Sequence, residues 1–240
     1  MNHNRRVFLQ AAGSAAAGVA LGSLPFAARA AAGDKVKIGV IGSGRIGGTL
    51  GGIWVKSGHE VMFSSLDIEQ DKALAAKLGG GARAGTTRDA VAFGDVLLLA
   101  VPYRAFPELS KEVGPAMKGK IVIDASNPIV ARDGEVAAEA REKGAGLAAA
   151  QYFPGARIVR AFNAIGYAKL PEFAGRPGTG MPMAADDQKA YAVAAELVRE
   201  VGLEPVLVGP LAMGKHLVPG TPLGGEHTPD EIRKIAATLK

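Results

Sequence analysis

The chain has 240 residues, of which 48% are hydrophobic and 21% charged, and it contains no cysteine. This composition is that of a globular protein, and the missing cysteines exclude disulfides, thiolate metal sites and a cysteine nucleophile. Three arginines that precede Gly33 contribute to the formal charge of +5, and the rest of the chain carries 25 basic and 23 acidic residues. Such a balance offers no electrostatic basis for binding nucleic acid.

The N-terminal segment resembles a twin-arginine export signal. Two adjacent arginines, Arg5 and Arg6, precede a moderately apolar stretch that Pro25 ends, and a small-x-small cleavage position follows. The stretch is short and weakly apolar for a membrane span, so we expect cleavage rather than a permanent anchor. We therefore expect residues 1–32 to be a signal peptide and residues 33–240 to be an exported, periplasmic protein without stable membrane insertion.

A glycine-rich turn follows the first predicted strand. Residues 35–41 are typical of a buried parallel strand, and beyond the turn we predict a helix to about Lys56 and a second strand over residues 60–64. The order strand, G-x-G-x-x-G, helix, strand indicates dinucleotide binding, with the pyrophosphate at the start of the helix. The residues of the turn are Gly42, Ser43, Gly44, Arg45, Ile46 and Gly47.

The end of the second strand bears on the choice between NADP and NAD. NAD-binding proteins usually carry an acidic residue here that bonds the ribose hydroxyls, but this strand ends in Ser64 and Ser65. Two hydroxyls suit a 2′-phosphate, and Arg45 is a candidate for the accompanying positive charge. Asp67 is alternatively the cap of a helix over residues 68–78. The pattern favours NADP and leaves NAD open.

The rest of the chain alternates strands with helices. Further strands are predicted over residues 95–101, 120–125, 157–162, 181–184 and 204–208. Helices are predicted over residues 106–114, 188–200 and 229–239, with a short one capped by Thr87. This alternation indicates an α/β fold with a doubly wound, mostly parallel Rossmann-like sheet in a single domain with a short C-terminal extension.

Ligands of such sheets bind beyond the carboxyl ends of the strands. Residues that follow the predicted strands are therefore expected to form a crevice with the glycine turn. Each is a weak signal alone, and their common location carries the hypothesis. These residues are Pro102, Tyr103, Asn127, Pro128, Asn163 and Ile165.

Short sequence blocks extend the analysis beyond the glycine turn. They lie at residues 38–47, 58–61, 100–102, 159–165, 185–187 and 209–211. Together they make the sequence similar to the NADP oxidoreductases dependent on coenzyme F420, over residues 35 to about 215. The first block is shared by many dehydrogenases, and the later blocks are more specific to this family. The resemblance implies NADP(H) as cofactor and coenzyme F420, a deazaflavin, or a flavin as co-substrate.

The resemblance also implies roles for single residues at the nucleotide end. Ser43 and Ser65 correspond to residues that contact the 2′-phosphate, and residues 44–47 to those that cover the pyrophosphate. The family often has an arginine directly after the serine at the end of the second strand, where this chain has Leu66.

At the reacting end, the resemblance places Val101 and Pro102 beside the nicotinamide and the turn from Asn163 to Ile165 against the deazaflavin. The two cofactors carry the chemistry of hydride transfer, and the protein aligns their rings. We therefore expect no catalytic side chain. We expect no metal site either, because no pair of histidines has a convincing ligand spacing, and His59 is expected on the surface.

Other functions remain open from the sequence alone. A reductase of small imines or carbonyls is one, but such enzymes carry a sizeable helical second domain, and only about thirty residues follow Val208. An exported NADP(H)-binding sensor or docking module without turnover is another. Small-molecule ligands are expected in each case, and pairing of the alanine-rich helices into a homodimer stays open.

Overall fold

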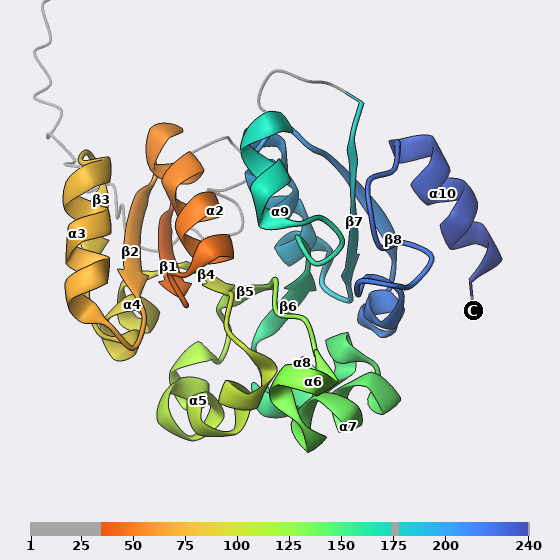
Figure 1. The fold of residues 1–240 in the computed structure, drawn as a ribbon, viewed down its shortest axis with the longest axis horizontal. Helices are drawn as coiled ribbons and strands as arrows, with labels where there is room; N and C mark the ends of the chain where they lie inside the picture. Colours follow the sequence, from red (N-terminus) through yellow and green to blue (C-terminus); the bar gives the residue numbers. More distant parts are fainter. Residues whose placement is uncertain (1–34, 174–177, 240) are drawn as a thin grey trace, which may run out of the picture.

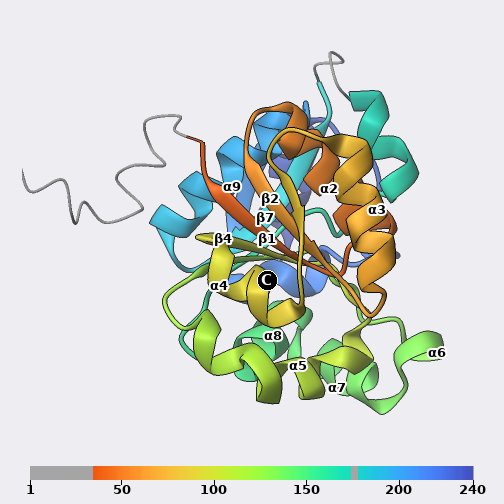
Figure 2. The same ribbon diagram turned by 90° about the vertical axis from the view of Figure 1, so that its left-hand side faces the viewer.

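The computed structural model describes residues 35–173 and 178–239. An eight-stranded sheet forms its centre and helices cover both faces (Figures 1 and 2). The strand order is β3-β2-β1-β4-β5-β6-β7-β8, and neighbouring strands are parallel except for β6 and β7. The predicted α/β fold with a doubly wound, mostly parallel sheet is confirmed.

The expected signal peptide, residues 1–32, lies outside the described residues. Within the described ranges, every helix is too short or too polar to span a bilayer.

The element bounds follow the sequence patterns closely. The strands are β1 (Lys37–Ile41), β2 (Glu60–Ser64), β3 (Ala82–Ala84), β4 (Val96–Leu99), β5 (Ile121–Asp124), β6 (Arg157–Arg160), β7 (Gly180–Ala185) and β8 (Glu204–Gly209). The α-helices are α2 (Arg45–Lys56), α3 (Ile68–Leu78), α4 (Thr87–Phe93), α5 (Phe106–Val113), α6 (Val130–Asp133), α7 (Glu135–Lys143), α8 (Ala145–Tyr152), α9 (Gln188–Glu200) and α10 (Pro229–Thr238). Short 3₁₀ helices are η1 (Tyr103–Ala105), η2 (Gly114–Met117), η3 (Tyr167–Phe173) and η4 (Leu211–His216).

Two local expectations need correction. Thr86, not Thr87, caps α4: its hydroxyl accepts the Asp89 N–H, and the Asp89 carboxylate accepts the Thr86 N–H in return. His59 is buried rather than on the surface. Its Nδ1 accepts the Val36 N–H at 3.0 Å, and its Nε2 lies 2.6 Å from the Glu200 carboxylate. His59 therefore ties the start of the sheet to the end of α9.

The side chains of the central strands pack in two layers. On β4, Val96 and Leu98 belong to the core under α2 and α9, while Leu97 and Leu99 belong to the core over α5 and α8. The buried indole of Trp54 links the two helices of the first layer, because its Nε1 donates to the Leu197 carbonyl at 3.0 Å. Burial on both faces explains why the central strands read as continuous apolar runs.

Candidate functional site

The turn between β1 and α2 has two glycines that the protein's own packing requires. Gly42 has a φ of +93°, and a Cβ there would lie 2.5 Å from the Ala100 carbonyl oxygen. At Gly47 a Cβ would lie 2.0 Å from the Gly42 carbonyl oxygen. These contacts hold the turn, the first turn of α2 and the end of β4 together, as the glycine pattern predicts.

Gly44 differs from these two glycines. It is the residue before α2, and a Cβ placed on it would meet no heavy atom of the described chain within 4 Å. The first N–H groups of α2 have no partner within the helix, which gives its start a partial positive charge. No acidic side chain lies in this first turn. The space over Gly44 therefore suits an anionic group that approaches the backbone closely.

Ser64 was expected to contact the cofactor, and the structure corrects this. Its side chain is fully buried, and its Oγ donates to the Val40 carbonyl at 2.8 Å. Its own carbonyl accepts the N–H groups of Gly42 and Ser43. Ser64 thus braces the glycine turn from inside, because the turn folds back over the end of β2.

Ser43 and Ser65 share one buried partner. Both hydroxyls donate to the carboxylate of Asp71 on α3, Ser65 at 2.9 Å, and Asp71 has no exposed surface. Asp67 accepts the N–H groups of Glu69 and Gln70 and so caps α3, which confirms one of the two roles considered for it. Asp71 was missed from the sequence, since nothing in the pattern of α3 marks one carboxylate as buried.

A cavity of about 580 Å³ opens at the carboxyl ends of β4, β5 and β6, a size typical of small-molecule sites. Seven predicted site residues line it, namely Arg45, Ile46, Val101, Pro102, Asn127, Asn163 and Ile165. Tyr103 and Pro128 are not among its lining residues. Tyr103 is buried beneath the loop after β4, where its hydroxyl donates to the Ala145 carbonyl at 2.7 Å and burial raises its pKa.

Two side-chain amides in the cavity wall have oxygen atoms without a hydrogen-bond partner. The Asn127 Nδ2 donates to the Asn163 carbonyl at 3.0 Å, and the Asn163 Nδ2 donates to the Ser126 carbonyl at 3.1 Å. The Oδ1 atoms of both side chains are buried without a partner in the described structure. An unpaired buried acceptor costs about 1–3 kcal/mol, so a rotation of either side chain that brought its oxygen to a ligand N–H donor in the cavity would recover this cost.

The bend before Asn163 is strained. Phe162 has a φ of +65°, a conformation that costs a bulky residue about 1–3 kcal/mol. Packing holds it there: the ring is buried edge-on against Trp54, with centroids 6.0 Å apart. The strained bend turns the chain into the cavity directly after β6.

A buried ion pair supports the same wall from behind. Arg160 and Asp124 are both fully buried, and Arg160 Nη1 lies 2.6 Å from Asp124 Oδ2 and 3.2 Å from the Ser126 carbonyl. Arg132, on α6, lines the cavity and donates to the Asn127 carbonyl at 2.9 Å. These residues were missed from the sequence. An arginine and an aspartate at the ends of adjacent buried strands, Asp124 and Arg160, would have been the available signal.

Arg45 and Tyr167 form the rim of the cavity. The Arg45 guanidinium lies 5.3 Å from the centroid of the Tyr167 ring, within the range of a cation–π contact. This places the Arg45 side chain at the cavity, whereas Ser65 is not among the lining residues.

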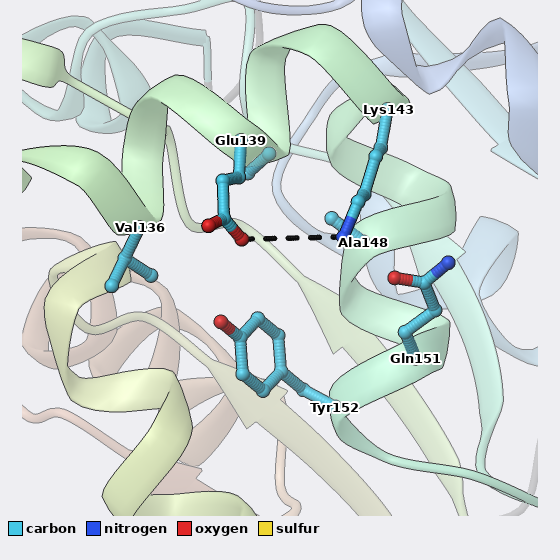
Figure 3. A pocket seen from close by; sticks show the side chains of 7 residues that line it. Val136, Glu139, Lys143, Ala148, Gln151 and Tyr152 are labelled. Carbon is cyan, nitrogen blue, oxygen red and sulfur yellow. Dashed lines mark ion pairs between the residues drawn. The ribbon is translucent and has the colours of Figure 1, made fainter.

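A second hollow, of about 230 Å³, lies between α7 and α8. Lys143 Nζ lies 4.0 Å from Glu139 Oε2. Figure 3 shows this ion pair beside the hollow, with the Tyr152 hydroxyl on the Glu139 side. No strand end lines this hollow, so it is separate from the ligand-binding edge of the sheet. Within the described ranges, no three His, Asp or Glu side chains cluster as metal ligands would.

Fold and site together define the class: a Rossmann-type oxidoreductase, with a glycine turn at a helix start and a cavity at the adjoining strand ends. The sequence profile described as "NADP oxidoreductase coenzyme F420-dependent" matches residues 37–128. An F420-dependent NADP reductase of Methanothermobacter thermautotrophicus is 30% identical over 202 residues, which cover 78% of this chain and 87% of that protein. The chain belongs to the family of F420-dependent NADP oxidoreductases.

Solved structures share the fold. A hypothetical protein of Sinorhizobium meliloti is 26% identical, with a TM-score of 0.66, covering 82% of this chain and 97% of that one. A structure described as a putative F420-dependent NADP reductase from Arthrobacter sp. FB24 has a TM-score of 0.60 at 19% identity, covering 75% of this chain and 87% of that one. The second likeness concerns the fold alone.

Proposed function

We propose that this enzyme transfers a hydride between NADP(H) and an acceptor, which is the deazaflavin coenzyme F420 or a flavin-like molecule. We propose further that the protein is exported and acts outside the cytoplasm. The observation that carries the proposal is the continuity of the site. Gly44 has open space at its Cβ position, and the two residues that follow it, Arg45 and Ile46, line the cavity. An extended dinucleotide fits this arrangement, with its diphosphate at one end and its reactive ring at the other.

The residues present fit such a ligand. Gly44 and the first N–H groups of α2 would hold the pyrophosphate. Val101 and Pro102 would flank the nicotinamide within the cavity. After a rotation toward the cavity, the unpaired amide oxygens of Asn127 and Asn163 would accept N–H donors from a carboxamide or from the ring system of the acceptor.

When bound, dihydronicotinamide would supply a hydride with its two electrons to the acceptor ring, and a proton from the solution would complete the reduction. The protein contributes alignment. The backbone at Phe162 sets the direction of the wall, and the Asp124–Arg160 pair fixes the loop that bears Asn127. Ile165 and Pro102 provide apolar surface that limits the access of water to the reacting rings.

Turnover tests the proposal directly. The purified protein is mixed with NADPH and, in separate reactions, with coenzyme F420, a free flavin or no acceptor, and NADPH oxidation is followed by absorbance. We expect oxidation with the deazaflavin or the flavin and none without an acceptor. Nucleotide binding with no oxidation by either acceptor would instead indicate a binding or sensor module.

A substitution at Gly44 tests the location of the site. Gly44→Ala should weaken nucleotide binding by about tenfold or more, because the new Cβ stands where the diphosphate approaches. The free energy of unfolding should fall by less than about 1 kcal/mol. Gly52→Ala, on the same helix with only ordinary contacts to Leu78, is the matched control. Equal nucleotide affinity in both variants would place the site elsewhere.

Export by the twin-arginine route forms part of the proposal. It rests on Arg5 and Arg6, the apolar stretch and the cleavage position. Replacing both arginines by lysine should retain the protein in the cytoplasm, as cell fractionation would detect. Export of the doubly substituted protein at the original rate would exclude this route.

A further inference from the structure

We infer that Asp71 sets the cofactor specificity of the ribose subsite, so that the enzyme accepts NAD(H) alongside NADP(H). The inference rests on the proposed function, since it concerns the adenosine end of the same nucleotide site. Its basis is the direction of the hydrogen bonds of Ser43 and Ser65, the two hydroxyls expected nearest the 2′ position of the adenosine ribose.

The hydroxyl protons of Ser43 and Ser65 both form hydrogen bonds within the protein. A carboxylate has only acceptor atoms, so Ser43 donates to Asp71 Oδ1. Ser65 donates either to Asp71 Oδ2 at 2.9 Å or to the Asp67 carbonyl at 3.2 Å. The Ser65 Oγ also accepts the Asp67 N–H at 3.1 Å. Toward a ligand, these two serines therefore present lone pairs rather than protons.

The two forms of the ribose differ in what they need from such a subsite. A 2′-hydroxyl carries a proton and can donate to a serine lone pair. A 2′-phosphate has only acceptors, so it requires donors or a cation. To bind it, Ser65 would have to turn its proton away from Asp71, which would leave a fully buried carboxylate short of a hydrogen bond.

The charges around the subsite act in the same direction. Between Ser64 and Lys72 the chain has three acidic residues and one basic residue. The one basic residue, Lys72, forms an ion pair with Glu69 at 2.8 Å. Leu66, directly after Ser65, is fully exposed, and Arg45 lies over Tyr167 at the cavity instead.

Binding measurements separate this inference from the proposed function. Dissociation constants for NADP⁺ and NAD⁺ are measured by titration calorimetry on the purified protein. We expect a preference for NADP⁺ of less than about tenfold. A larger preference would overturn the inference and leave the proposed function intact, whereas failure to bind either nucleotide would defeat the proposed function itself.

Asp71→Asn is the decisive variant. It keeps the side chain's size but removes the charge and one acceptor, so the affinity ratio should shift toward NADP⁺ by about threefold or more. Glu108→Gln, which removes an equal charge from an exposed position on α5, is the control and should shift the ratio less. An equal shift in both variants, or a smaller one in Asp71→Asn, would refute a specific role of Asp71.

A second variant covers the case in which Asp71→Asn does not fold. Leu66→Arg adds a cation at an exposed position without disturbing the buried network. It should strengthen NADP⁺ binding by about tenfold while leaving NAD⁺ binding within about threefold. Unchanged NADP⁺ affinity would show that the 2′ position lies away from these serines and would overturn the inference.

Discussion

The glycine turn and the cavity lie next to each other but differ in how their polar groups are paired. In the turn, backbone groups are paired within the protein: Gly42 and Ser43 donate to the Ser64 carbonyl, and Gly47 packs against Gly42. In the cavity, two amide oxygens are left without partners and Phe162 holds a strained backbone. The turn needs a ligand only at the N–H groups that begin α2, whereas the wall of the cavity keeps unpaired side-chain acceptors.

The difference separates two tasks of a nucleotide enzyme. A diphosphate is the same in every cofactor molecule, so a rigid turn with one open position, Gly44, is sufficient to hold it. The reacting rings must be aligned, and unpaired acceptors reward only a ligand that brings donors to the right place. Substitutions in the turn should therefore affect folding or binding, while substitutions in the cavity should affect turnover.

The largest effect is expected at Gly47. Gly47→Ala would place a Cβ 2.0 Å from the Gly42 carbonyl oxygen, and because that oxygen is backbone, the loss should reach about 3 kcal/mol in the free energy of unfolding. Chemical denaturation measures it, with Gly44→Ala as the comparison. Similar stabilities for the two variants would contradict the division between packing glycines and the open one.

A smaller effect, on rate rather than folding, is expected at Asn163. Asn163→Leu keeps the branching of the side chain but removes its unpaired oxygen and the Nδ2 donor to the Ser126 carbonyl, so kcat/KM for the acceptor should fall by about tenfold, equivalent to one hydrogen bond. The nucleotide dissociation constant should change by less than about threefold. An equal loss in nucleotide affinity would mean that the cavity and the turn do not have separate tasks.

The smallest effect is expected far from both regions. The Arg157 guanidinium beside Asp187 holds the pKa of that carboxyl well below its usual value, through hydrogen bonds of 2.6 and 3.0 Å. The stability that this pair contributes is therefore present above the ordinary carboxyl pKa of about 4 and is lost as the pH falls toward the folded pKa.

Asp187→Asn isolates this contribution, since asparagine can still cap α9. At pH 7 the free energy of unfolding should fall by no more than about 1 kcal/mol, because the pair is partly exposed. As the pH is lowered from about 5 to about 2, the difference between variant and wild type should shrink progressively. A difference that stays constant with pH would show that the charge of Asp187 is not its source.

Sequence patterns predicted the elements with clear periodicity and missed those without it. β2, α3 and α9 have the predicted bounds, since buried runs and caps mark their ends. β3 has three residues, and the alanine-rich α7 and α8 lack a distinct apolar stripe, so neither pattern was strong enough. The antiparallel direction of β7 also depends on long-range packing.

For the site, the sequence predicted where residues lie but not what their side chains contact. Topology alone brings Pro102, Asn127 and Asn163 to one edge, because parallel strands end together. What a side chain does there depends on neighbours from distant segments. Ser64 is buried because the glycine turn folds over it, and Asp71 gains its place only when α3 packs beneath Ser43 and Ser65.

The antiparallel pairing of β6 and β7 determines where an insertion can be placed without affecting the cavity. Because β7 is antiparallel to β6, the loop after β7, which bears Asp186, lies at the opposite edge of the sheet from Asn163. Additions grafted onto that loop would extend the molecule away from the reacting rings. An insertion there would leave the backbone around Asn163 in place.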